Sequence, residues 1–134
     1  MWVVVPDVVA DRSGTLREWE IHAPKLLNMG HTLAMAVQNG MTQADVPESA
    51  SVVFVGGTTE WKWRNLKMWT DNFSRVHVGR VGSERLLWMA HDAGAESCDS
   101  TGWGREGYGS GRIQGLMNYL EESTTGRKQQ IMSL

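Results

Sequence analysis

The sequence predicts an α/β fold in which about five parallel strands alternate with helices. Short apolar runs recur about every 20 to 25 residues, a helical pattern separates each run from the next, and the runs lack the polar alternation of half-exposed strands. Because parallel strands need long crossover connections, this spacing indicates βα units joined by right-handed crossovers. We expect one domain over residues 1–122 and a polar tail over residues 123–134.

The apolar runs predict strands at residues 1–5, 33–37, 51–55, 76–78 and 96–98. Helical patterns cover residues 15–30, 60–71, 84–93 and 112–122, with a short helix or turn within 43–49 and a glycine-rich loop at 101–111. Thr15 and Glu18 form a capping-box pattern, so the first helix is expected to begin there, and Pro24 is expected to kink or divide it. Thr58 or Thr59 caps the second helix.

Apolar residues at helical spacing predict the buried faces of the helices. Ser83 is the expected cap of the third helix. The residues expected to point inward are Trp61, Leu66 and Trp69 in the second helix, Leu86, Leu87 and Ala90 in the third, and Ile113, Leu116, Met117 and Leu120 in the last.

The number of βα units narrows the architecture. Five units are too many for one βαβ motif and too few for an eight-stranded barrel, so the count favours the C-terminal half of a TIM barrel. Its first strands are then missing from this chain or supplied by another. An open doubly wound sheet is the alternative, and periodicity does not separate the two.

Composition limits the functional classes. The net charge of −2 gives no general argument for nucleic-acid binding, and the single cysteine, Cys98, excludes an internal disulfide and a cysteine-rich zinc site. No apolar run approaches the length of a membrane span and no charged-then-apolar leader is present, so we expect a soluble, cytoplasmic protein. No metal motif, P-loop or Ser-His-Asp pattern occurs, and we expect no cofactor.

Polar or glycine residues follow each predicted strand, where the carboxyl ends of parallel strands converge. They are Asp7, Gln38, Gly56, Gly57, Gly79, Arg80 and Asp99. Any one of them is more often a turn or cap residue, but their recurrence at the same position, directly after a strand, weakens that interpretation. Glycine pairs of this kind resemble loops whose backbone N–H groups approach an anion or a base edge.

Asp99 is the candidate catalytic residue, because a carboxylate can attack an electrophilic sugar carbon. Capping of the Thr101-Gly102 turn is an equally good interpretation from spacing alone. The histidines lack ligand spacing, and His77, on an apolar strand, reads as a packed core histidine. Trp103, in the glycine-rich loop, could lie against a flat base.

Five short motifs together resemble the tRNA-guanine transglycosylase superfamily, most closely the C-terminal half of its phage and bacterial members that place deazaguanines in DNA. The motifs are PD at 6–7, VQNG at 37–40, VGGTTEWK at 55–62, HVGRVGSERL at 77–86 and GAESCDSTGWGR at 94–105. Their order and spacing extend over roughly residues 2–122.

The resemblance implies a TIM barrel that exchanges a base in a nucleic acid without breaking the backbone. It implies that Asp99 is the nucleophile, which holds a covalent aspartyl-sugar intermediate. The implied binding residues are Asp7 and Gln38 at the base edge, Gly56 and Gly57 at the backbone wall, Val78 on the base face, and Arg105 in a phosphate or orienting role just beyond the nucleophile. Gly79 and Arg80 belong to the binding set by their place after a strand, and Arg80 and Lys62 are candidates for the phosphate path by charge and position alone.

Two departures from the family refine the hypothesis. The second aspartate of the family belongs to the first half of the barrel, before the place where this chain begins, and the zinc-binding cysteines are absent. We therefore expect a homodimer or a partner chain that completes the barrel, or else an inactive fragment, and DNA rather than tRNA as the nucleic acid. A non-catalytic nucleotide- or phosphate-binding module or regulator is the alternative, and a hydrolase that uses water as the acceptor is a third.

Overall fold

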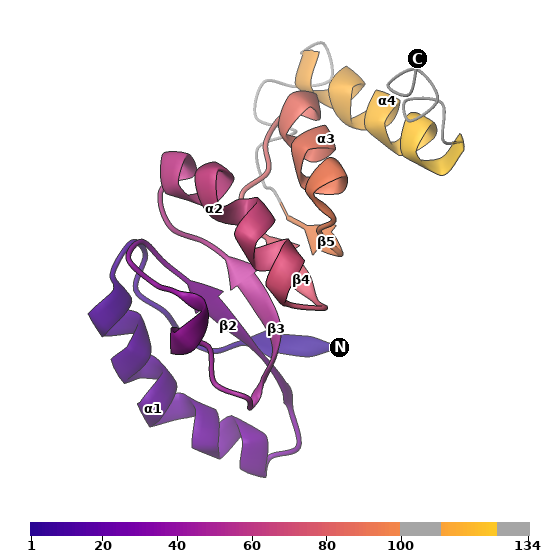
Figure 1. Ribbon diagram of the computed structural model, residues 1–134. Coiled ribbons are helices and arrows are strands. Elements are labelled where there is room, and N and C mark those ends of the chain that lie inside the picture. Colours follow the sequence, from indigo (N-terminus) through magenta and orange to yellow (C-terminus); the bar gives the residue numbers. More distant parts are fainter. Residues whose placement is uncertain (100–110, 126–134) are drawn as a thin grey trace.

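The computed structural model describes residues 1–99 and 111–125 and shows five parallel strands and four α-helices, in a sheet that curls as half a barrel (Figure 1). The strands are β1 (Trp2–Val4), β2 (Thr32–Val37), β3 (Ala50–Val55), β4 (Val76–Val78) and β5 (Ser97–Cys98). The helices are α1 (Arg12–Asn28), α2 (Thr59–Asn72), α3 (Glu84–Ala93) and α4 (Gly111–Thr125), with a short 3₁₀ turn, η1 (Gln43–Asp45).

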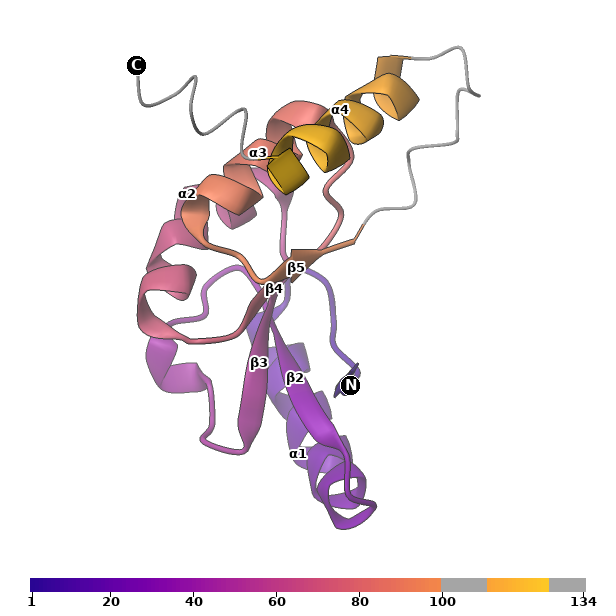
Figure 2. The ribbon, with the colours of Figure 1, turned by 90° about the vertical axis from the view of Figure 1, so that its right-hand side faces the viewer.

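The strands pair in sequence order, β1-β2-β3-β4-β5, and every pairing is parallel. A doubly wound sheet would reverse its order at a switch point. The described strands show no such reversal, so the partial-barrel prediction is confirmed and the doubly wound alternative is wrong. Figure 2 shows the curl of the sheet from β2 to β5.

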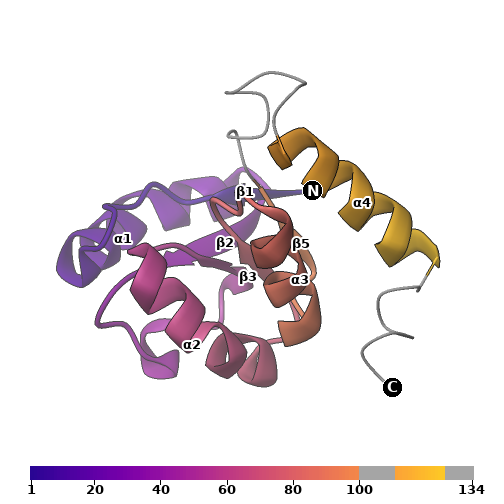
Figure 3. The same ribbon diagram turned by 90° about the horizontal axis from the view of Figure 1, so that it is seen from above.

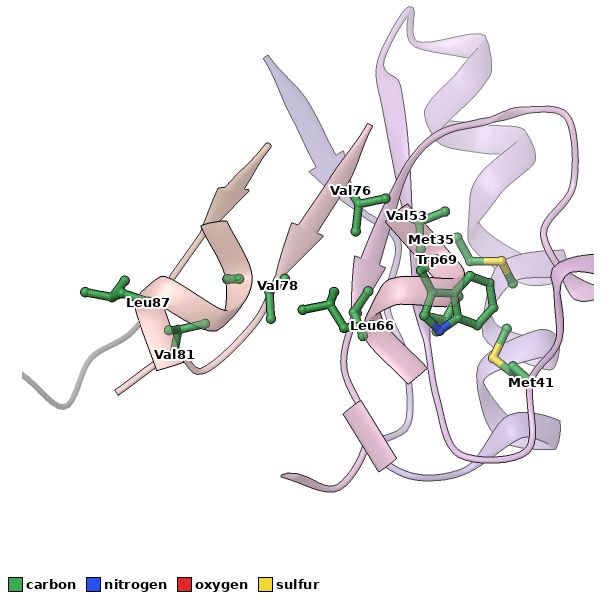
Figure 4. Close-up of a cluster of buried hydrophobic side chains, with 12 residues drawn as sticks. Met35, Met41, Val53, Leu66, Trp69, Val76, Val78, Val81 and Leu87 are labelled. Carbon is green, nitrogen blue, oxygen red and sulfur yellow. The ribbon is translucent and has the colours of Figure 1, made fainter. Parts of the chain in front are cut away.

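One face of the sheet packs against the helices. The register places Met35, Val53 and Val76 on this face, and each is almost fully buried. Leu66 and Trp69 of α2 pack against them (Figure 4). Seen from above, α1, α2 and α3 curve around the strands, and α4 lies beside α3 (Figure 3).

The opposite, inner face of the sheet carries the alternate side chains of each strand. Register partners Phe54, His77 and Ser97 all project to this side, together with Trp2 of β1. The rings of Trp2, Phe54 and His77 are mutual neighbours, with centroids 4.8 to 6.3 Å apart. An aromatic cluster therefore lies on the inner face of the half-barrel.

The start of α1 differs from the prediction. Asp11 is the N-cap, and its carboxylate accepts a hydrogen bond from the Gly14 N–H at 2.9 Å, while Thr15 lies inside the helix. The Thr15 hydroxyl instead bonds both backbone groups of Val8, which holds the loop after β1. Pro24 does not divide the helix, which continues to Asn28.

The inner face of α4 also differs from the prediction. Met117 and Leu120 are more than half exposed, whereas Gly115 is buried and Leu116 and Tyr119 pack toward the core. A Cβ on Gly115 would lie 2.9 Å from the Cβ of Glu84, so the absence of a side chain permits the close approach to α3. The helix runs to Thr125, three residues beyond its expected end.

Candidate functional site

A pocket of about 230 Å³ opens at the carboxyl ends of the first four strands. Its volume is several times the ~30 Å³ share of one water molecule. Its lining residues are Asp7, Val9, Gln38, Phe54, Gly56, Gly57, Gly79 and Arg80. The structure thus brings together six residues that the strand-end pattern singled out, and adds Val9 and Phe54.

Gln38 holds the carboxylate of Asp7 in place. The Gln38 side chain is buried, its Nε2 donates to Asp7 Oδ2 at 2.5 Å, and its Oε1 accepts from the Ala10 N–H at 2.9 Å. Partial burial raises the pKa of Asp7 above its usual value, and the Gln38 hydrogen bond and the Arg80 charge oppose that shift. Gln38 therefore acts mainly by fixing Asp7, which presents an acceptor to the pocket.

At two glycines, Gly57 and Gly79, the main chain lines the pocket. Gly57 has a φ of +79°, and a Cβ there would lie 2.6 Å from Asn39 Oδ1 and 2.7 Å from the Trp61 ring. A Cβ on Gly79 would lie 2.7 Å from the Phe54 ring. Any side chain at either position would therefore collide with its surroundings, so the main chain itself forms this part of the pocket wall.

Arg80 connects this pocket to Asp99. Its φ of 55° is in the left-handed region, which costs a residue other than glycine about 1–2 kcal/mol. Its guanidinium donates to the Gly57 carbonyl, and its backbone N–H donates to Asp99 Oδ1 at 3.2 Å. A strained residue held on both sides is typical of a functional loop.

Asp99 directly follows β5, beside the pocket. Its N–H donates to the Val78 carbonyl at 3.1 Å, and its carbonyl accepts from the Val81 N–H at 2.7 Å, so its backbone is fixed by the loop after β4. Its side chain is 48% exposed. The exposed carboxylate is thus available to a ligand that enters the pocket beside it.

His77 is a site residue that the sequence interpretation missed. It is buried, as expected, but its Nε2 lies 2.7 Å from Asp99 Oδ2 and its Nδ1 lies 2.7 Å from Ser97 Oγ. The alternation of side chains along a strand could have identified His77. It precedes Gly79 by two residues, so its side chain lies on the inner face, the same face that Gly79 presents to the pocket.

Lys62 does not lie on a phosphate path, contrary to its sequence-based assignment. The residue is 1% exposed, and its ammonium group donates to the Gly79 carbonyl. Burial, followed by the positive charge of Arg80, lowers the pKa of Lys62 to about 8, while Asp99 partly offsets the shift. Lys62 therefore stabilises the loop after β4 through its hydrogen bond to the Gly79 carbonyl.

Val78 also lies away from the position expected for it. It is fully buried among the residues between the sheet and the helices, because alternation along β4 sends its side chain to the face opposite His77. Phe54 is the apolar ring that lines the pocket. Arg105 and Trp103 lie outside the described residues.

The described part of the chain contains no group of three or more His, Cys, Asp or Glu residues arranged to hold a metal ion. None of the described helices is long and apolar enough to cross a bilayer. No protein-family model, curated protein or solved structure matches the chain. The fold and the site therefore define the class as an α/β half-barrel with a carboxylate-lined pocket at the carboxyl ends of its strands.

Proposed function

We propose that the chain is a base-exchange protein of the tRNA-guanine transglycosylase type, which replaces guanine in a nucleic acid with a deazaguanine. The observation that supports this most is the half-exposed Asp99 carboxylate beside a pocket lined by Asp7 and backbone glycines. DNA is the proposed nucleic acid, tRNA is the alternative, and the cytoplasm is the proposed location.

The proposed chemistry has two displacement steps at the sugar C1 carbon. Asp99 attacks C1 as the bond to guanine breaks, and the bonding electrons leave with the base, which takes up a proton from water. The incoming base then loses a proton and attacks C1, which releases the carboxylate. The backbone phosphates remain intact throughout.

The pocket contains complementary groups for a guanine-like base. Guanine presents N–H donors on one edge and a carbonyl acceptor beside them. The Asp7 carboxylate can accept from the donors, and the Gly57 N–H and the Arg80 guanidinium can donate to the carbonyl. The fixed position of Asp7 lowers the conformational cost of binding such an edge.

A partner chain or a second copy is part of the proposal. β1 and β5 form the two edges of the described sheet, so each presents one side without a strand partner. We expect a homodimer or a complex that completes a barrel. Light scattering over a dilution series should show a mass above that of the monomer, and a folded monomer at all concentrations would contradict this.

Covalent trapping tests the catalytic proposal. The protein is incubated with guanine-containing DNA, and separately with tRNA, and analysed by denaturing gel and intact mass for wild type, Asp99→Ala and Asp99→Asn. An adduct that survives denaturation and is absent from both variants is expected with DNA. Release of free base without incorporation of another would instead indicate hydrolysis.

A non-catalytic nucleotide- or phosphate-binding module is the second candidate. It is favoured by the hydrogen bonds that both Asp99 oxygens already accept, because such bonds make a carboxylate a weaker nucleophile. On this alternative, wild type forms no adduct, and Asp99→Ala binds a nucleotide as tightly as wild type. Arg80→Ala would then weaken binding, since it removes the pocket cation.

A further inference from the structure

Ser97, His77 and Asp99 form a continuous chain of side-chain hydrogen bonds on the inner face of the sheet. Ser97 Oγ lies 2.7 Å from His77 Nδ1, and His77 Nε2 lies 2.7 Å from Asp99 Oδ2. The register makes this alignment possible, because His77 pairs with Ser97 in the parallel ladder and Asp99 follows two residues later on the same side.

The chemistry of the three groups determines which atoms donate. An ionised carboxylate can only accept, so the hydrogen between His77 and Asp99 belongs to His77 Nε2. Ser97 can either donate to Nδ1 or accept from it, since a hydroxyl does both. In each case the imidazole ring donates to Asp99, and a neutral ring protonated only at Nδ1 does not fit this arrangement.

The imidazole ring is itself held in place. His77 is 7% exposed, and its ring lies 4.8 Å from the Phe54 centroid and 5.0 Å from the Trp2 centroid. Contacts on this scale, together with hydrogen bonds at both nitrogens, leave the ring little freedom to rotate. The donor therefore has a fixed direction before any ligand binds.

The two oxygens of Asp99 are held unequally. Oδ2 accepts from His77 at 2.7 Å, a distance typical of a strong charge-assisted bond, whereas Oδ1 accepts the Arg80 N–H at 3.2 Å. The oxygen with the weaker hydrogen bond keeps more of its nucleophilic character. Oδ1 is thus the oxygen better suited to attack.

We propose that His77, held by Ser97, is a positioning residue that fixes the Asp99 carboxylate so that Oδ1 is presented to the sugar carbon. This inference rests on the proposed function. The bond from Oδ1 to C1 forms as the bond from C1 to the base breaks, and His77 keeps its proton throughout. In the second step, the same N–H stabilises the carboxylate as it leaves.

The geometric part is tested by NMR, independently of any activity. Ring ¹⁵N shifts should show that His77 Nε2 carries a hydrogen, and the three-bond couplings to Asp99 ¹³Cγ should report a single rotamer. In His77→Phe, which keeps a ring but removes the donor, the couplings should average. His31→Gln, at an exposed position, is the matched control and should leave them unchanged.

The catalytic part is tested by the rate of adduct formation in single turnover. His77→Phe should slow it about 100-fold, the usual order of effect for a misplaced reacting group, with unchanged affinity for the nucleic acid. His77→Gln, whose amide can donate in place of Nε2, should recover most of the rate. Ser97→Ala should slow it less than His77→Phe.

The outcomes separate this inference from the proposed function. Unchanged Asp99 couplings in His77→Phe, or a neutral His77 ring protonated at Nδ1, would overturn the positioning role. An adduct that forms at the wild-type rate in His77→Phe would also overturn it. Absence of any adduct in wild type with a single Asp99 rotamer would instead refute the proposed function and leave the hydrogen-bonded chain as a structural device.

Discussion

Lys62 makes the stability of this protein depend on pH in a direction that can be measured. Its ammonium group is buried under the loop after β4, where it donates to the Gly79 carbonyl. Burial lowers the pKa of Lys62 from 10.5 to about 8. The informative change is Lys62→Met, which keeps an unbranched side chain and removes the titrating group.

The sign follows from proton linkage. Between pH 8 and pH 10.5 the unfolded chain holds the Lys62 proton more tightly than the folded chain does, so this residue makes the folded state more stable as pH rises. From pH 7 to pH 10 the gain is about 2.5 kcal/mol. Lys62→Met lacks this gain.

Cys98 and Tyr119 have pKa shifts of the opposite sign. Burial raises the pKa values of Cys98 and Tyr119, so their contribution to stability falls with increasing pH. Both residues are present in wild type and in Lys62→Met. The difference in stability between the two proteins therefore isolates Lys62.

Urea unfolding at pH 7, 8, 9 and 10, followed by tryptophan fluorescence, measures this difference. The free energy of unfolding of wild type should rise relative to that of Lys62→Met by about 2.5 kcal/mol across the series. The loss of the hydrogen bond to Gly79 shifts the whole curve of the variant but not its pH dependence. A difference that stays constant within about 0.5 kcal/mol would refute the burial of a charged lysine.

Three further predictions concern the pocket and the core. Gly57→Ala should destabilise the fold by about 2–4 kcal/mol, because strain and a clash combine, whereas Gly30→Ala, also at positive φ but with open space around it, should cost about 1 kcal/mol. Equal losses in chemical denaturation would contradict this. Leu66→Ala should cost about 2–5 kcal/mol, since it opens a cavity in the core, and a loss below 1 kcal/mol would show that the site collapses. Gln38→Ala should raise the pKa of Asp7 further, because it removes a hydrogen bond that favours the carboxylate; a lower value in a ¹³C NMR titration would argue against that bond.

The strands were predictable because apolar, β-branched runs bounded by glycine, proline or asparagine leave few alternatives, whereas only the number of βα units favoured their consecutive order. The helix ends were less so. Asp11 and Thr15 are both good caps, and only the contact of Thr15 with Val8 shows why Asp11 takes that position. The buried face of α4 depends on a close approach at Gly115, which hydrophobic periodicity does not reveal.

Most residues that line the pocket could be predicted from the polar and glycine positions after the strands, but the roles of the individual side chains could not. Alternation along β4 separates Val78 from His77, and applying this rule strictly would have placed His77, not Val78, on the side of the site. The burial of Lys62 depends on a long side chain that reaches from α2 to the Gly79 carbonyl, a contact with no local signature. The sequence alone therefore did not predict which side chains of different helices and strands form hydrogen bonds with one another.

The consecutive order of the strands has a consequence for how the chain acquires its structure. Within the described sheet each strand pairs with its neighbour along the chain, so most pairings close loops of one βα unit, which are about the shortest closures that a parallel sheet allows. During synthesis on the ribosome the sheet can grow unit by unit from β1. The wall formed by Gly79 and Arg80 appears only with the fourth unit and Asp99 only after the fifth strand, so a chain stalled earlier would have a core without the Asp99 carboxylate.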